Sequence, residues 1–569
     1  MKSYLPLLIG CFLFTNSIAQ QNTTTYNYHS PIDVPIFLSG TFAELRSNHF
    51  HSGIDIRTAN KPGHKVFAIE DGYVSRIAVS PGGFGKALYI AHPDGHTSVY
   101  AHLQQLEGEI ANYLKTQQYK QERFEVNLFP PKDLLPVKKG QVIALSGNSG
   151  SSEGPHLHFE IRDSKTEETL NPLAFGFKVN DHIKPIIARL VIYPIGNQSY
   201  ANNSSKRSTI AVSGIGVNEK PKQQTNFEAS GEIAFGITAS DQLDGVPNSN
   251  GIYSVTLSID NKVFYQFVAD RFAFDETRYI NSFIDYDFFQ NFKSRVMRTE
   301  IDPMNKLSMY EKAANKGILK VEEGKNYEAE YIVKDFQGNI SRVPFTVKGI
   351  KAKPITSARN DTTLFNIQVN KPFEITAKDY FVQFESGNFY RDQLIDCKPR
   401  LEKGFLSNGL TVGSKNIPVQ KVYKIGIKPN NEKINKDKLL IVSIVNGEKP
   451  YAIGGKWENG FVIANVKIMG TFAIMADSIQ PQIKAVNFTK GGSVHGLKRL
   501  QVEIQDELSG ISSYRGTLNG QWILMDCDSK NKLLTYDFDE RLKKGKNKLV
   551  VKVVDNCGNT NIFTTEISY

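Results

Sequence analysis

The stretch GPHLHFEIR, residues 154–162, alternates polar and apolar side chains. Successive side chains of a β-strand point to opposite faces, so this alternation predicts a strand with one face directed at a core. The apolar face would carry Leu157, Phe159 and Ile161. The opposite face carries two neighbouring imidazoles, His156 and His158. Such a pair suits metal binding or proton transfer, but a solvent-exposed polar face gives the same pattern. Other parts of the chain are needed to distinguish these two interpretations.

The N-terminus has the pattern of an export signal. Lys2 precedes an apolar run, Tyr4–Phe14, and small residues stand just before Gln20. This pattern predicts a signal peptide over residues 1–19 and a mature protein that works in the periplasm or cell envelope. The sequence LIGC also resembles a lipoprotein cleavage box, which would place a lipid anchor on Cys11.

Composition excludes several other classes of protein. No later segment approaches the roughly 18 uninterrupted apolar residues of a membrane helix, so we expect no transmembrane segment after signal removal. The net charge is +10 and the pI about 9.0, but no stripe of Lys and Arg with interleaved aromatics indicates a nucleic-acid partner. Beyond the N-terminal segment, three cysteines are too few for a disulfide scaffold or a cysteine zinc site, although a single Cys527–Cys557 bridge would leave only Cys397 unpaired.

We expect residues 20–185 to form an antiparallel β domain that carries any catalytic or metal-binding residues. Nine of the eleven histidines precede residue 160. From Lys65 to His102, short β-rich runs alternate with Gly, Pro and Asp turns, which is typical of a meander. The stretch Leu106–Gln121 has helix-forming composition instead, so we expect a helical insertion at about 106–135.

The rest of the chain predicts further β domains, because 569 residues exceed the roughly 250–300 residues of a single core. The segment SDQLDG at Ser240 parallels QDELSG at Gln505, and VKDFQGN at Val333 parallels VVDNCGN at Val553. Both copies resemble bacterial immunoglobulin-like β-sandwiches, and they predict such modules at 186–350 and 481–569, with a further β-rich domain at 351–480. The overall fold class is therefore mainly β, and we interpret these three domains as support.

A second motif, His51-x-x-x-Asp55, lies upstream of the meander. An i, i+4 pair would share a helix face, but Gly53 and two isoleucines are poor helix formers. A fully extended strand would separate the two Cα atoms by about 13 Å, too far for one metal ion. We therefore expect the chain to bend at Ser52 and Gly53.

Three motifs then occur in a fixed order: HFHSGIDI, YAHL and GNSGSSEGPHLHFEI. Together, over about residues 40–175, they resemble the signature motifs of the lysostaphin/LytM-type zinc endopeptidases, which cut peptide cross-links of bacterial peptidoglycan. The resemblance implies three Zn2+ ligands, His51, Asp55 and His158. It also implies that His102 of YAHL and His156 act on the substrate.

The chemistry of these residues agrees with that implication. Two histidines and one carboxylate leave the fourth tetrahedral position of zinc open, as in a catalytic site. One neighbouring imidazole could transfer a proton and another could stabilise the oxyanion, and the sequence leaves open which of the two does which.

Several other polar residues lie near the three motifs. His92 and His96 flank a Pro-Asp-Gly hairpin turn and are not expected to bind metal. Arg46, Asn48 and His49 lie beside the site and are candidates for substrate contact or support. Glu160 could either orient a metal ligand or form a surface salt bridge.

We therefore expect an exported zinc metalloendopeptidase that hydrolyses peptide cross-links of peptidoglycan, with a regulatory envelope protein as a further partner. The alternatives are a catalytically silent LytM-type regulator and an envelope scaffold or adhesin that acts through its β-sandwiches. The helical insertion leaves from the strand that carries His102, so we place it at the rim of the substrate groove, as a lid. A helix packed on the domain's flank is the alternative.

Overall fold

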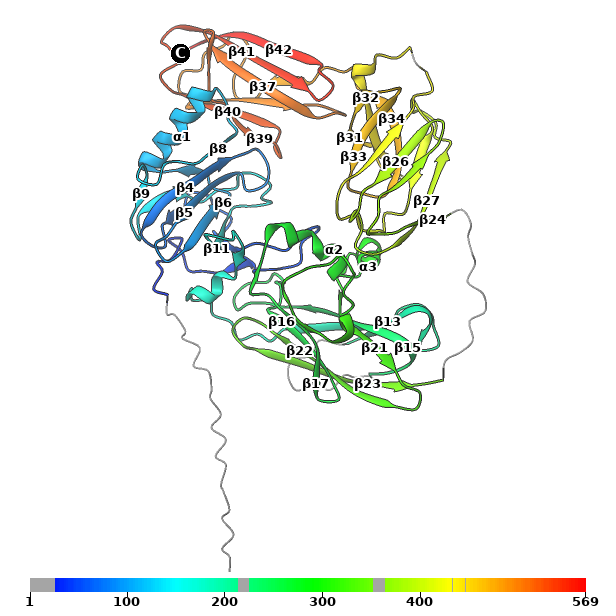
Figure 1. Cartoon of the computed structure of the whole chain (residues 1–569). Coiled ribbons are helices and arrows are strands. Elements are labelled where there is room, and N and C mark those ends of the chain that lie inside the picture. The colour runs from blue at the N-terminus through cyan, green and yellow to red at the C-terminus, as the bar shows by residue number, and fades with distance from the viewer. Residues whose placement is uncertain (1–25, 213–224, 352–363, 432, 446) are drawn as a thin grey trace, which may run out of the picture.

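The computed structural model describes residues 26–212, 225–351, 364–431, 433–445 and 447–569. The expected signal peptide and Cys11 lie outside this range. The described chain is mainly β-strand, which confirms the expected fold class. Four β-rich bodies follow one another around an open ring, and the last body lies against the first (Figure 1). Within the described residues, no helix is long and apolar enough to span a bilayer.

The N-terminal body is built on one antiparallel sheet. Its strand order is β1 (Leu38–Gly40), β2 (Ile54–Arg57), β11 (His156–Asp163), β6 (His96–Ala101), β5 (Lys86–Ala91), β4 (Gly72–Val79) and β8 (Val126–Leu128), with β9 (Pro136–Val137) on β4 and β12 (Thr169–Leu170) on β11. A smaller sheet joins β3 (Lys65–Phe67), β10 (Val142–Leu145) and β7 (Gln105–Leu106). The helix η1 (Pro172–Phe175) follows β12.

Strand β11 has the alternation that the sequence predicts. Leu157, Phe159 and Ile161 are fully buried in the core of this body, because they share the apolar face of the strand. The strand lies between β2 and β6, so its other face meets residues from both neighbours. The two histidines are therefore fixed in the middle of the sheet.

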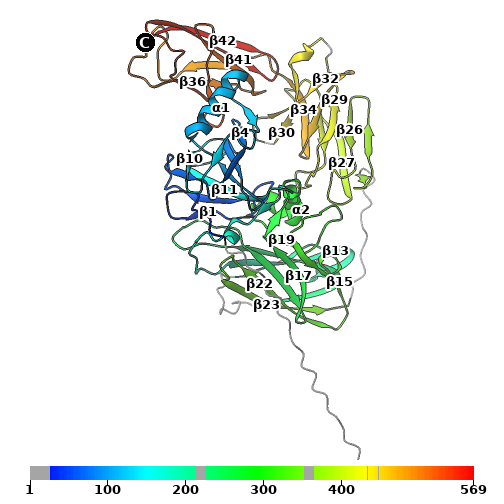
Figure 2. The same ribbon diagram turned by 60° about the vertical axis from the view of Figure 1, so that its left-hand side comes forward.

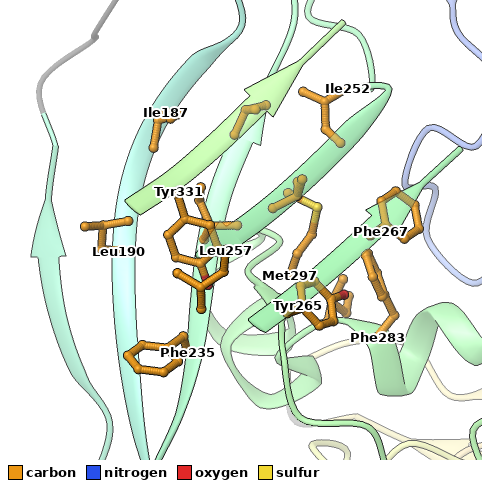
Figure 3. Close-up of a cluster of buried hydrophobic side chains, with 14 of the residues drawn as sticks. Ile187, Leu190, Phe235, Ile252, Leu257, Tyr265, Phe267, Phe283, Met297 and Tyr331 are labelled. Carbon is orange, nitrogen blue, oxygen red and sulfur yellow. The ribbon is translucent and has the colours of Figure 1, made fainter. Parts of the chain in front are cut away.

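The second body contains a ten-stranded sheet. Its strands are β13 (Ile186–Ala201), β14 (Ser208–Ala211), β15 (Asn226–Ser240), β16 (Ser254–Ile259), β17 (Lys262–Val268), β19 (Met297–Arg298), β20 (Tyr310–Ala313), β21 (Ile318–Val321), β22 (Asn326–Lys334) and β23 (Ile340–Gly349). Its short helices are η2 (Phe274–Tyr279), α2 (Ile280–Phe283), α3 (Tyr286–Phe292) and η3 (Ala314–Gly317). Figure 3 shows its core, to which five different strands contribute Leu190, Phe235, Leu257, Tyr265 and Tyr331. Strand β18 (Arg271–Phe272) leaves this body and pairs with β12 of the first.

The third and fourth bodies each contain two sheets around one core. One sheet of the third body contains β24 (Leu364–Ile367), β27 (Gln393–Arg400), β28 (Gly409–Val412), β34 (Gly470–Ala476), β30 (Leu439–Ile444) and β31 (Tyr451–Gly454). The other sheet contains β25 (Phe373–Thr376), β26 (Tyr380–Phe384), β29 (Tyr423–Ile427), β33 (Phe461–Val466) and β32 (Lys456–Glu458). The short helix η4 (Lys436–Lys438) also belongs to this body. One sheet of the fourth body contains β35 (Gln482–Ala485), β36 (Arg499–Gln505), β40 (Leu533–Asp537) and β39 (Asp526–Asp528). Its other sheet contains β38 (Gln521–Trp522), β37 (Ile511–Leu518), β41 (Lys546–Asp555) and β42 (Thr560–Ser568).

All three described cysteines are free, so the Cys527–Cys557 bridge suggested by the sequence is wrong. The two residues belong to different surroundings. Cys527 lies on β39 and packs at the edge of the fourth core, whereas Cys557 follows β41 and packs against Leu440 and Val442 of the third body.

The expected helical insertion forms α1 (Gly108–Gln121), which starts two residues late because Leu106 belongs to strand β7. Ile110 and Leu114 bury one side of α1 in the N-terminal core. The end of the helix contacts the fourth body, as Figure 2 shows. The Tyr119 ring lies edge-on to Trp522 with centroids 5.2 Å apart. Its hydroxyl donates a hydrogen bond to Asp539.

We predict that Tyr119→Ala loosens the contact between the fourth body and the N-terminal body. The substitution removes an edge-to-face pair, worth about 1 kcal/mol beyond its buried area, and a hydrogen bond to a carboxylate. Small-angle scattering should show a larger radius of gyration. Thr116→Ala, which changes an exposed residue of the same helix, is the matched control and should leave the profile unchanged. Identical scattering profiles for wild type and both variants would show that Tyr119 does not hold the fourth body against the N-terminal body.

Candidate metal centre

The pairing of β2 with β11 brings two of the predicted ligands together. In this register Asp55 lies directly opposite His158. The chain bends at Ser52 and Gly53 before β2 begins, as the sequence predicts, and this bend brings His51 back over the strand pair. A Cβ atom on Gly53 would lie 2.3 Å from the carbonyl oxygen of Phe159, so only glycine allows the two segments to approach so closely.

Three side-chain atoms converge at this point. His51 Nε2 lies 3.0 Å from Asp55 Oδ1 and 3.0 Å from His158 Nδ1, and the last two atoms are also 3.0 Å apart. All three residues are buried. The distances are close to the roughly 3.3 Å that separates neighbouring ligands of a tetrahedral zinc ion with bonds of about 2.0 Å. The donor set therefore fits a tetrahedral divalent cation such as Zn2+, with one coordination position left over.

The hydrogen bonds of the two imidazoles assign their tautomers. His51 donates from Nδ1 to the carbonyl oxygen of Thr41 over 2.8 Å. His158 donates from Nε2 to Glu160 Oε1 over 2.9 Å. Each ring therefore directs its other nitrogen, Nε2 of His51 and Nδ1 of His158, at the point of convergence, where a bound metal would take the place of a proton.

One buried ion pair, Arg162–Glu160, and one partly exposed ion pair, Arg46–Asp55, hold the candidate ligands in place. Glu160 is fully buried and also accepts hydrogen bonds from Ser52 Oγ and Arg162 Nε. This burial decides between the two interpretations of Glu160 in favour of a carboxylate that orients a ligand. Arg46 Nη2 donates to Asp55 Oδ2 over 2.9 Å, which leaves Oδ1 directed at the two imidazoles.

The electrostatics of the centre favour a cation. Burial alone would lower the pKa of His158, but its hydrogen bonds to Asp55 and Glu160 outweigh burial and raise that pKa to about 9. Two carboxylates thus make the point of convergence attractive to positive charge.

His102 and His156 lie beside the three candidate ligands, and their ring centroids are 4.8 Å apart. His102 donates from Nδ1 to the Ser149 carbonyl over 2.9 Å, and His156 donates from Nδ1 to the Gly154 carbonyl over 2.8 Å. Both therefore turn Nε2 toward the groove, and His156 Nε2 lies 3.3 Å from Asp55 Oδ1. The structure brings all five residues singled out in the sequence into one cluster.

The backbone of His102 is strained. Its φ is +57°, which is uncommon for a residue other than glycine, and it directly follows β6. A hydrogen bond from its N–H to the Phe84 carbonyl holds this conformation. Burial, and then the charges of His158 and His156, lower the pKa of His102 to about 3, so the ring is neutral at neutral pH.

The five residues line a groove of about 1100 Å3. Arg46 and His49 also line it, whereas Asn48 does not. Burial is the main cause of a lowered pKa at His49. His92 is buried elsewhere, where it bonds to the Asp71 carbonyl and Ser98 Oγ beside the β5–β6 turn.

One wall of the groove comes from the second body. Phe274, Thr277 and Arg295 line it, and Thr277 Oγ1 accepts a hydrogen bond from the Phe50 backbone N–H over 3.0 Å. Sequence reasoning missed these residues, because no motif marks them and only the docking of two bodies brings them to the site.

The predicted position of the insertion at the groove rim is wrong. None of the described residues 106–135 lines the groove. The reason is that α1 buries Ile110 and Leu114 in the core and directs Tyr119 at the fourth body. The fourth body itself comes closer to the site, since Lys530 Nζ donates to the Ser152 carbonyl over 2.9 Å.

Parts of the chain are similar to known proteins. Residues 49–119 and 132–172 match the family described as "Peptidase family M23", and residues 365–477 match a "Zu5-like domain". An "Uncharacterized metalloprotease" of Haemophilus influenzae is 33% identical over 123 residues, which are 22% of this chain and 20% of that protein. The "DD-carboxypeptidase/endopeptidase Mpg" of Neisseria meningitidis is 31% identical over 118 residues, which are 21% of each chain. The chain thus spans about a fifth of the length of these curated relatives.

Among solved structures, a mutant catalytic domain of the prophage-encoded M23 protein EnpA from Enterococcus faecalis is similar. The sequence identity is 25%, and the match covers 27% of this chain and 97% of that domain, with a TM-score of 0.19.

We predict that Gly53→Ala lowers the stability of the N-terminal body by about 2 kcal/mol, because the new methyl group would overlap the Phe159 carbonyl. Thermal unfolding measures this loss. Gly154→Ala is the control, since a Cβ atom there meets nothing within 4 Å. Equal melting temperatures for the two variants would contradict the close approach of β11 to the bend.

Proposed function

Because the chain carries a Peptidase family M23 domain, we propose that it is an exported zinc metalloendopeptidase that hydrolyses peptide cross-links of bacterial peptidoglycan. The observation that carries the proposal is the convergence of His51 Nε2, Asp55 Oδ1 and His158 Nδ1 in an open groove beside two further imidazoles. Bound there, zinc supplies a Lewis acid that polarises a carbonyl and lowers the pKa of water to about 7.

The chain's own residues supply the proton transfers. His102 and His156 each present Nε2 to the groove, because their Nδ1 atoms donate to backbone carbonyls. Such a nitrogen can accept a proton from the attacking water and return it to the leaving amine. In its protonated form it can donate a hydrogen bond to the developing oxyanion. The hydrogen bonds at Nδ1 turn the Nε2 atom of both rings toward the groove, so either ring is placed to accept the proton.

Several observations support the substrate class and the location. The Neisseria relative is named as an endopeptidase, and the motif resemblance to lysostaphin/LytM-type enzymes supports peptidoglycan as substrate. The signal pattern in residues 1–19 supports export to the periplasm or cell envelope. We propose that residues 186–569 hold the peptidase domain in place and offer the surface for a regulatory envelope protein.

An active enzyme is favoured over a silent regulator, because all five positions carry the residues that the chemistry needs. An adhesin or scaffold would need no such cluster. Retained binding of residues 186–569 to purified cell walls, with no turnover by the full chain, would favour the scaffold instead.

Arg295 is suited to select the substrate. It lines the groove on the wall that comes from the second body. Peptidoglycan stem peptides carry free carboxylates, and a guanidinium binds a carboxylate through two parallel hydrogen bonds. We propose that Arg295 binds such a carboxylate and so orients the stem along the groove.

We predict one zinc ion per chain in the mature protein. His158→Ala should lose both the metal and the activity. His102→Ala and His156→Ala should retain the metal and lose activity by roughly 10²–10³-fold, because each loses one proton-transfer or oxyanion group. Metal analysis by mass spectrometry, combined with muropeptide release from purified peptidoglycan, tests all three variants. Loss of zinc in His156→Ala with retention in His158→Ala would reverse the two roles.

We also predict that Arg295→Ala raises KM about tenfold and leaves kcat nearly unchanged, because it removes a contact made equally in the ground state and the transition state. Lys293→Ala, which removes a nearby exposed charge outside the groove, is the matched control. Initial rates on a soluble cross-linked muropeptide give both constants. Equal KM values for wild type and Arg295→Ala would exclude substrate binding by Arg295.

A further inference from the structure

Three buried aspartates meet where the second body joins the peptidase domain. Asp181 lies on the segment that leaves the peptidase domain, Asp241 directly follows β15, and Asp335 directly follows β22. One carboxylate oxygen of each lies within 4.8 Å of the other two. The three residues are only 6%, 3% and 2% exposed, respectively.

Two carboxylate oxygens in this cluster have no hydrogen-bond partner. They are Asp181 Oδ2 and Asp241 Oδ1, and both are buried. A buried carboxylate oxygen without a partner loses its hydration and gains nothing in return. Burial, and then the charges of Asp181 and Asp335, raise the pKa of Asp241 to about 8. The pKa of Asp181 rises to about 6, again mainly because of burial.

The third aspartate is held in a fixed position. Asp335 Oδ1 accepts hydrogen bonds from the backbone N–H groups of Gly338 and Asn339, over 2.7 and 2.9 Å. The Asn339 amide also donates to the Asp181 backbone carbonyl over 3.1 Å. The turn therefore fixes Asp335 and the departing segment relative to each other before any ligand binds.

The C-terminal body repeats this arrangement with one difference. Its cluster is Asp477, Asp506 and Asp555, and the Asn559 amide donates to the Asp477 carbonyl over 2.9 Å, as Asn339 does to Asp181. Here, however, the carboxylates have partners from the Leu508–Gly510 turn. Asp477 Oδ2 accepts from the Ser509 N–H over 3.0 Å, and Asp506 Oδ2 accepts from the Gly510 N–H over 2.7 Å. The same backbone arrangement thus gives the carboxylate oxygens of the C-terminal cluster hydrogen-bond partners. In the cluster of Asp181, Asp241 and Asp335 it leaves two carboxylate oxygens without a partner.

We propose that Asp181, Asp241 and Asp335 bind a Ca2+ ion that fastens the second body to the peptidase domain. The donors are all oxygen, which suits a hard cation and not zinc or copper. Ca2+ accepts six to eight oxygen ligands at 2.3–2.6 Å in flexible geometry, so ligands on opposite sides of the ion lie up to about 5 Å apart. Its two positive charges offset three clustered carboxylates that the fold otherwise buries together.

An ion at this position would be connected to the groove through a short series of hydrogen bonds. Asp241 and Asn250 exchange two backbone hydrogen bonds of 2.9 and 2.7 Å. The next residue, Gly251, donates from its N–H to Thr41 Oγ1 over 2.9 Å. The Thr41 carbonyl is the acceptor that orients His51. A cation at Asp241 therefore stabilises the loop that supports one of the zinc ligands.

The test uses the mature full-length protein, stripped with EDTA and reloaded with one equivalent of zinc, in wild-type form and as Asp241→Asn and Asp506→Asn. Bound 45Ca2+ is measured by equilibrium dialysis, and Tm is measured with and without CaCl2. We expect Asp241→Asn to bind one Ca2+ per chain fewer than wild type. We also expect it to lose a calcium-dependent rise in Tm of about 5–10 °C at one hundred times the Kd. Asp506→Asn, the matched control in the repeated cluster, should behave as wild type.

The sign of the effect distinguishes a cation site from a buried acidic cluster. Without bound calcium, at a pH above the Asp241 pKa of about 8, Asp241→Asn relieves repulsion between carboxylates and should raise Tm. In a calcium site the same substitution lowers Tm when calcium is present. If wild type and Asp241→Asn bind equal calcium, or if Asp241→Asn is the more stable protein in calcium, the proposal fails. Asp181→Asn replaces Asp241→Asn if the latter does not fold. Neither readout depends on peptidase activity, so this result stands apart from the proposed function.

Discussion

The pairing of β2 with β11 is the interaction on which the site depends. It places Asp55 opposite His158, and a shift by one residue would turn His158 to the core and Leu157 to the groove. The buried apolar face of β11 prevents that shift, because three fully buried side chains would have to leave the core. The hydrophobic pattern of one strand therefore fixes the register that brings the candidate metal ligands together.

A layer of buried hydrogen bonds then determines how each ligand faces the centre. Thr41 and Glu160 fix the tautomers of His51 and His158, and Arg46 fixes Asp55. These supports come from the loop after β1, which the second body holds through Gly251, and from β11 itself. The site is thus a product of two bodies, although its ligands all belong to one.

The sequence predicts much of this centre, since strand alternation and three ordered motifs identify all five clustered residues. It also predicts the bend at Gly53. Features that depend on long-range docking were not predictable. Arg295 reaches the groove from the second body. The insertion helix packs against the fourth body through Tyr119 and does not lie at the groove rim. The immunoglobulin-like character of the modules at 186–350 and 481–569 stays a prediction.

The central claim is that His51, Asp55 and His158 form one metal centre. Diffraction from zinc-loaded crystals, recorded on both sides of the zinc absorption edge, tests it most directly. The account predicts one strong anomalous peak in the peptidase domain, bonded to His51 Nε2, Asp55 Oδ1 and His158 Nδ1. A peak bonded to His102 or His156 in place of these ligands, or no peak in the groove, would contradict it.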